Sequence, residues 1–94
     1  MTSYIALIRK DAGSDFGVDF PDFPGCVSAG VTLDEARRMA QEALELHVGG
    51  MVEDGENLPA PSSLEAIMAD SENGDAVAFL VALPEAPDRT VRVK

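Results

Sequence analysis

Residues 16–26 read FGVDFPDFPGC and hold three of the four Phe, two of the six Pro and the single Cys of this 94-residue chain. The first five residues alternate between Phe or Val and smaller or charged residues, as in a strand with one buried face. The two prolines then fix φ and remove two backbone donors, and Gly25 tolerates a positive φ. The stretch therefore predicts a strand that ends in a turn and delivers Cys26 to a third strand, CVSAG (26–30).

Two further segments have the composition of strands. YIALIRK (4–10) is short, apolar and followed by the turn-like DAGSD, so it predicts a buried strand that forms a hairpin with residues 16–20. AVAFLVAL (76–83) is an unbroken apolar run closed by Pro84. Such a run predicts a central strand that is covered on both faces.

The segment from Thr32 onward has helical periodicity. TLDE is a capping box in which the Thr32 hydroxyl accepts from the amide of residue 35 and Glu35 reaches back to the amide of residue 32. Apolar residues then recur at helical spacing as far as Val52, which predicts an amphipathic helix of about five to six turns. Gly49 and Gly50 each cost roughly 1 kcal/mol within a helix, so we expect close packing or an early end there. SSLEAIM (62–68) predicts a short second helix capped by Ser62.

The predicted order is β-β-β-α-α-β, an α+β fold with an antiparallel three-stranded meander, a long helix, a short helix and a fourth strand. The long helix is expected over the face that carries Phe16, Val18 and Phe20. Residues 1–84 form one domain, because chains usually split only above roughly 250 residues. A core this small often needs a partner subunit, so we expect a homo-oligomer, at least a dimer.

The charge balance is strongly acidic. Seven Lys and Arg oppose 17 Asp and Glu, giving a net charge of −10. Such a domain repels nucleic-acid phosphates and favours a basic partner. The single Cys, the absence of a signal peptide and the absence of a long apolar run predict a cytoplasmic protein without a membrane span. No Cys/His cluster is present, so we expect no metal and no cofactor.

Three landmarks, FPDFPGC, TLDEA and EDGENLPAPS, occur in that order within residues 4–62. In these the chain resembles the N-terminal domain of HicB antitoxins. The resemblance implies a reduced ribonuclease H-like arrangement of the predicted elements. It also implies a function, which is to bind and silence a small basic HicA-type toxin that cleaves mRNA.

The HicB resemblance also implies a C-terminal DNA-binding module, often ribbon-helix-helix, through which the complex represses its own operon. Residues 85–94 resemble a linker and the opening strand of such a module, with a basic, DNA-facing tail of Arg89, Arg92 and Lys94. The residues that would complete it are absent from this sequence. DNA binding is therefore expected only if a module exists beyond Lys94.

The residue pattern argues against a catalytic function. A two-metal nuclease needs carboxylates from its strands, and neither YIALI nor AVAFLVAL contains one. Asp19 and Asp22 flank a proline, as is typical of a turn and less so of an acid/base pair. His47 has no second ligand to share a metal, and Cys26 has no base placed near it, so we interpret Cys26 as a small buried apolar residue. We expect no enzyme.

The residues expected to contact the toxin are acids and one exposed ring. They lie around the PDFPG turn and just after the predicted long helix. They are Asp15, Asp19, Asp22, Phe23, Glu53, Asp54 and Glu56. Two alternatives remain open, a stand-alone oligomeric interaction module without a toxin, and a DNA-binding repressor that depends on residues beyond Lys94.

Overall fold

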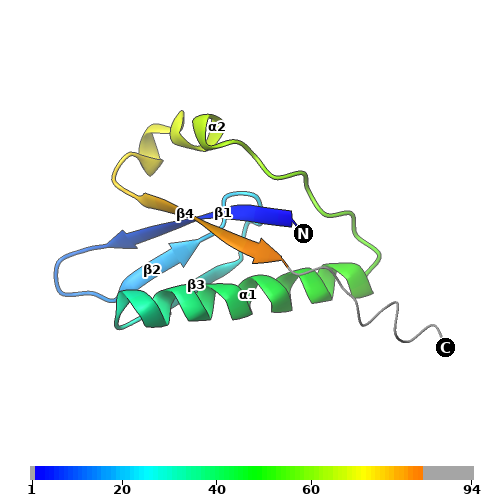
Figure 1. Cartoon of the computed structure of the whole chain (residues 1–94), viewed down its shortest axis with the longest axis horizontal. Coiled ribbons are helices and arrows are strands. Elements are labelled where there is room, and N and C mark those ends of the chain that lie inside the picture. The colour runs from blue at the N-terminus through cyan, green and yellow to red at the C-terminus, as the bar shows by residue number, and fades with distance from the viewer. Residues whose placement is uncertain (1, 84–94) are drawn as a thin grey trace.

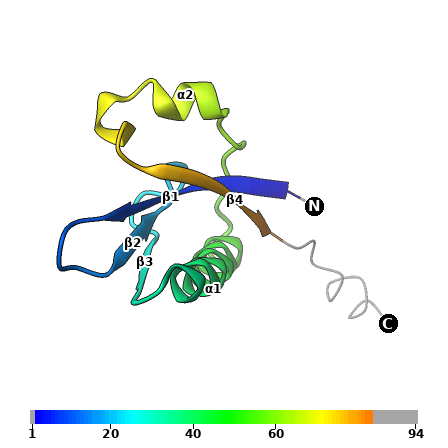
Figure 2. The ribbon, with the colours of Figure 1, turned by 60° about the vertical axis from the view of Figure 1, so that its left-hand side comes forward.

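The computed structural model describes residues 2–83. The elements follow the predicted order, with one added 3-10 turn, η1: they are β1 (Thr2–Lys10), β2 (Phe16–Asp19), β3 (Val27–Gly30), α1 (Leu33–Glu53), α2 (Leu64–Met68), η1 (Ser71–Asn73) and β4 (Val77–Leu83). The strands form one antiparallel sheet in the order β3-β2-β1-β4. Figure 1 and Figure 2 show α1 on one face of this sheet and α2 on the other.

The main core lies between the sheet and α1. Ile8, Val18 and Phe20 are buried against the helix, and Phe16 packs at the margin of the same cluster. The predicted position of the long helix is therefore confirmed. Three residues of the helix are fully buried at this contact: Ala36, Ala40 and Leu44.

The cap of α1 differs from the prediction by one residue. The Thr32 hydroxyl accepts from the Glu35 amide at 3.0 Å, as expected, but the Glu35 carboxylate accepts from the amide of Val31 at 2.7 Å and not from that of residue 32. The expectation for Gly49 and Gly50 was wrong, because α1 continues to Glu53 and a Cβ on either glycine would meet no atom within 4 Å.

The second face of the sheet has a smaller core. Ile5 and Leu7 of β1 pack there against Ile67 of α2 and Ala76. The short helix is capped by Ser63, whose hydroxyl accepts from the Ala66 amide at 3.1 Å, so the assignment of Ser62 as its cap was wrong.

The final strand lies at an edge of the sheet, which corrects its predicted central position. Within residues 2–83, β4 pairs with β1 on one side only. The strand buried on both faces is β1, in which residues 4–8 are all buried. The unbroken apolar sequence of β4 leaves Val77 64% and Leu80 68% exposed.

Candidate interaction surface

The turn between β2 and β3 is closed by three backbone hydrogen bonds. The Phe23 amide donates to the Phe20 carbonyl at 2.9 Å, the Cys26 amide donates to the Phe23 carbonyl at 2.9 Å, and the Phe20 amide donates to the Cys26 carbonyl at 3.3 Å. Gly25 has a φ of +91°, a value that other residues adopt only with strain. The predicted structural role of this stretch is confirmed.

Phe23 lies inside the protein, which corrects the expectation that it is exposed at the turn tip. Its side chain is 2% exposed, and its ring packs edge-on against Tyr4 at a centroid distance of 4.6 Å and against His47 at 5.7 Å. The turn folds back beneath α1, so the ring fills the core. His47 is consequently an aromatic packing residue of the helix.

Asp22 anchors the segment that follows α1. Its carboxylate accepts the backbone N–H of Ser62 at 2.8 Å and the Ser62 hydroxyl at 2.6 Å. Nearby, the Tyr4 hydroxyl donates to the Pro59 carbonyl at 2.6 Å. Burial, and then the charge of Asp22, raise the pKa of Tyr4. These contacts hold the 54–63 segment along the sheet, a role that the sequence did not reveal for Ser62.

Asp19 is engaged by Arg9, another residue that sequence reasoning missed. The Arg9 Nε donates to Asp19 at 2.8 Å, while its two terminal nitrogens donate to the Glu72 carbonyl at 3.0 Å and to Asn73 Oδ1 at 2.8 Å. The bond to Asp19 raises the pKa of Arg9. The sequence signal for this role was a charged Arg directly after the apolar residues of the YIALIRK strand. Asn73 completes the network by donating to the Ile67 carbonyl at 2.8 Å.

Glu53, Asp54 and Glu56 are exposed around the C-terminal end of α1. Gly55, with a φ of +76°, turns the chain, and the Glu56 amide donates to the Met51 carbonyl at 2.9 Å. The last turn of the helix contains no basic residue. Acids at a helix C-terminus face the negative end of the macrodipole, which disfavours them by about 0.3–1 kcal/mol each. Within residues 2–83, none of the three side chains accepts a hydrogen bond or forms a salt bridge that would offset this cost.

The seven predicted contact residues do not form one cluster. Asp15 is exposed in the β1–β2 turn, at the opposite end of β2 from Asp22. Asp19, Asp22 and Phe23 have structural partners, as described above. Four of the seven, Asp15, Glu53, Asp54 and Glu56, are therefore exposed, and three of these gather at the exit of α1.

Other potential sites have structural explanations. Cys26 is 3% exposed and its thiol donates to the Ala43 carbonyl at 3.6 Å; burial raises its pKa. The interpretation of Cys26 as a buried apolar residue is thus confirmed. Residues 2–83 contain no group of three or more His, Cys, Asp or Glu side chains placed to hold a metal ion. None of the helices in the same range is long and apolar enough to cross a bilayer.

A family model described as the HicB-like antitoxin of bacterial toxin-antitoxin systems matches residues 4–93. The chain belongs to the HicB-like antitoxin family. The chain is also similar to a 14.9 kDa protein encoded in the rep-hol intergenic region of Haemophilus phage HP1, to which it is 44% identical over 78 residues, or 83% of this chain. The resemblance seen in the sequence is therefore confirmed.

Solved HicB structures share the fold. The antitoxin HicB of Burkholderia pseudomallei is 36% identical and superimposes with a TM-score of 0.83 over 92% of this chain. The HicA3 and HicB3 toxin-antitoxin complex contains a chain that is 28% identical, with a TM-score of 0.70 over 88% of this chain. This chain spans 58% of the HP1 protein and 66% of the B. pseudomallei HicB. The domain described here thus corresponds to the N-terminal part of HicB, whose isolated domain it matches over 99% of that domain's length.

Proposed function

We propose that this HicB-like domain is the antitoxin of a type II toxin-antitoxin pair, and that it binds and occludes a small basic HicA-type ribonuclease that cleaves mRNA. One observation carries the proposal: the domain has the fold of a chain in the HicA3 and HicB3 toxin-antitoxin complex. Its net charge of −10 agrees with this role, because it would let the domain compete with nucleic acid for a basic protein. Charge of that sign attracts a nuclease that binds phosphate backbones.

The toxin-facing residues in this proposal are the free acids. Glu53, Asp54 and Glu56 are exposed, and no Lys or Arg of residues 2–83 forms a salt bridge with them. By contrast, Asp34 pairs with Arg37 and Arg38, at 3.2 and 3.7 Å. A basic toxin would relieve the repulsion between the three acids and the helix dipole. Asp15 contributes to steering from the other end of the sheet.

In this account the protein is not an enzyme, acts without a cofactor and works in the cytoplasm, where mRNA is cleaved. Asp19 bonds to Arg9, Asp22 bonds to Ser62, and burial raises the pKa of the Cys26 thiol, which supports structural roles for these three residues. Inhibition is therefore steric and electrostatic. Apolar contacts would hold the toxin after the acids have steered it into place.

Two assembly properties belong to the same proposal. The domain forms a homo-oligomer, at least a dimer, and DNA binding with operon autorepression requires a C-terminal module beyond Lys94. The tail residues Arg89, Arg92 and Lys94, assigned to that DNA side, lie outside the described residues. A stand-alone oligomeric interaction module is the alternative, favoured by the exposed apolar residues of β4.

Co-expression separates the two functions. The small basic protein encoded beside this gene should arrest growth when expressed alone, and co-expression of the 94-residue chain should restore growth and yield a complex that purifies intact. Growth arrest that persists beside a well-expressed, folded chain would favour the stand-alone module. Glu53→Lys, Asp54→Lys and Glu56→Lys combined should weaken the rescue, whereas Glu65→Lys on α2 should preserve it.

A further inference from the structure

Within residues 2–83, one edge of β4 is unpaired, and the strand lacks the features that normally protect such an edge. Sheet edges are usually shortened, charged, bulged or interrupted by proline, because their unpaired N–H and C=O groups pair readily with another strand. β4 runs for seven residues, VAFLVAL, without a charge or a proline. The opposite edge strand, β3, has only four residues. Of the two edges, β4 is the one suited to pairing.

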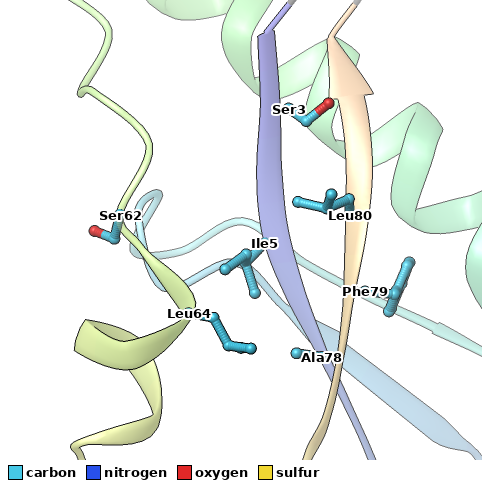
Figure 3. A pocket seen from close by; sticks show the side chains of 7 residues that line it. All are labelled: Ser3, Ile5, Ser62, Leu64, Ala78, Phe79 and Leu80. Atoms are coloured by element: carbon cyan, nitrogen blue, oxygen red, sulfur yellow. The ribbon is translucent and has the colours of Figure 1, made fainter.

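Apolar side chains are exposed on both faces of this edge. On the α2 face, Leu80 is 68% exposed and Leu64 is 49% exposed. Figure 3 shows these two side chains with Ile5 along a groove between the β1–β4 pair and the start of α2, while Phe79 lies on the other side of β4. The groove has a volume of about 370 Å³.

A second apolar groove lies on the α1 face of the same strand. It is lined by Leu33 and Arg37 of α1 together with Ile8, Val77 and Phe79, and its volume is about 200 Å³. Leu33 is 58% exposed and Val77 is 64% exposed. An incoming strand would therefore gain backbone hydrogen bonds at the edge and apolar burial above and below it.

Charge identifies the occupant of this edge. A basic toxin is drawn to the acids, and residues 76–83 offer none. Two copies of a chain with a net charge of −10 repel each other over most of their surface, so they can meet favourably only where charge is absent. An antiparallel strand is also self-complementary across a two-fold axis, as an isologous dimer requires.

We propose that β4 is the dimerisation edge, where a second copy of this chain pairs antiparallel to make one continuous eight-stranded sheet. A standard interface buries about 800 Å² per partner, which is more than strand pairing alone provides, so the two grooves contribute Leu33 and Leu64. Gln41 donates to the Ala82 carbonyl at 2.7 Å and occupies that end of the edge. Pairing is therefore centred toward Val77–Leu80.

The inference specifies the surface of the self-association proposed above and is independent of toxin binding, because its test uses the 94-residue chain alone. Sedimentation equilibrium should give a dimer mass for the natural chain. Leu80→Lys would place two charges in the interface and should raise the dimer dissociation constant by about 100-fold or more, which corresponds to about 2.7 kcal/mol. Leu46→Lys, at an 81% exposed position on α1, is the matched control and should remain a dimer.

Hydrogen exchange locates the contact. Amides of residues 76–83 should exchange more slowly at concentrations where the dimer forms than at concentrations where it dissociates, and amides in the C-terminal half of α1, residues 44–53, should show no such dependence. Circular dichroism of Leu80→Lys checks that the monomer is folded, which its exposed position favours. A natural chain that is monomeric throughout the concentration series would overturn the proposal, as would a dimer that Leu80→Lys leaves intact. Loss of toxin inhibition alone would not contradict the proposed dimer interface.

Discussion

The carboxylate of Asp22 accepts both the backbone N–H of Ser62, at 2.8 Å, and its hydroxyl, at 2.6 Å, across 40 residues of sequence. This pair joins the β2–β3 turn to the segment that leaves α1. Because the turn also supplies Phe23 to the core, the pair couples the placement of the 54–63 segment to the packing of the sheet on α1.

Removing this carboxylate should destabilise the fold. Hydrogen bonds to a charged group each contribute about 1.5–3 kcal/mol when buried, and Asp22 is half-buried, so we expect Asp22→Ala to lower the free energy of unfolding by about 1–2 kcal/mol. Asp15→Ala, at an exposed turn, should change it by less than about 0.5 kcal/mol. Urea denaturation measures both. Equal effects of the two substitutions would show that the Asp22 bonds do not stabilise the protein.

The two members of the pair should also depend on each other. Ser62→Ala should cost less in the Asp22→Ala background than in the natural chain, since the hydroxyl then has no carboxylate to bond. A double-mutant cycle should give a coupling of about 0.5–1.5 kcal/mol. Additive effects would mean that the two residues act separately.

Two glycines should respond in opposite directions to alanine. A Cβ on Gly30 would lie 2.7 Å from the Cα of Ala36, so Gly30→Ala should push α1 from the sheet and lower the free energy of unfolding by about 1–3 kcal/mol. Gly50 lies at an exposed position of α1 where an added Cβ would meet no atom within 4 Å, so Gly50→Ala should raise the free energy of unfolding by about 0.5–1 kcal/mol. Thermal melts of the two variants provide the comparison, and a stabilising Gly30→Ala would refute the close contact.

The pattern of correct and incorrect predictions has a physical basis. The meander and α1 follow from local signals, namely strict alternation in FGVDF, turn residues in PDFPG and the Thr32 capping box, which act between near neighbours in sequence. The edge position of β4 depends on pairing with β1 across the whole chain. An unbroken apolar run is compatible with burial on two faces and with burial between partner subunits, so its sequence does not separate the two.

The candidate site was less predictable for the same reason. Charge and turn chemistry pointed to exposed acids, and four of them are exposed. Phe23 was expected at the surface because it lies between the two prolines of the turn, but the hydrogen bond from the Phe23 amide to the Phe20 carbonyl folds that turn back under α1. The partners of Asp19 and Asp22 lie 10 and 40 residues away, beyond the range of local sequence patterns.

The thiol of Cys26 should be unreactive in the folded protein and should make stability depend on alkaline pH. Burial raises its pKa, so the stabilisation is fully present below the ordinary thiol pKa and is lost as pH rises through the folded value. The free energy of unfolding should therefore fall as the pH rises above the ordinary thiol pKa, and Cys26→Ala should reduce this fall. Tyr4, whose pKa is also raised, contributes a further decline at higher pH. Rapid labelling of the native thiol at neutral pH would contradict its burial.

Neutralising the acids at the exit of α1 should separate binding from stability. Glu53→Gln and Glu56→Gln together should raise the free energy of unfolding by a few tenths of a kcal/mol or more, because the helix dipole disfavours these charges. The same variant should bind the toxin more weakly and with a shallower dependence on salt. Calorimetric titration at two ionic strengths measures the second effect. Unchanged affinity would remove these residues from the interface.

Inhibition of the toxin's ribonuclease activity tests the central claim most directly. Purified toxin is mixed with a defined mRNA and increasing amounts of the 94-residue chain, and the intact RNA is quantified. The account predicts that cleavage falls in proportion to added chain and stops once every toxin molecule is bound. Cleavage that continues undiminished in a large excess of folded chain would contradict it.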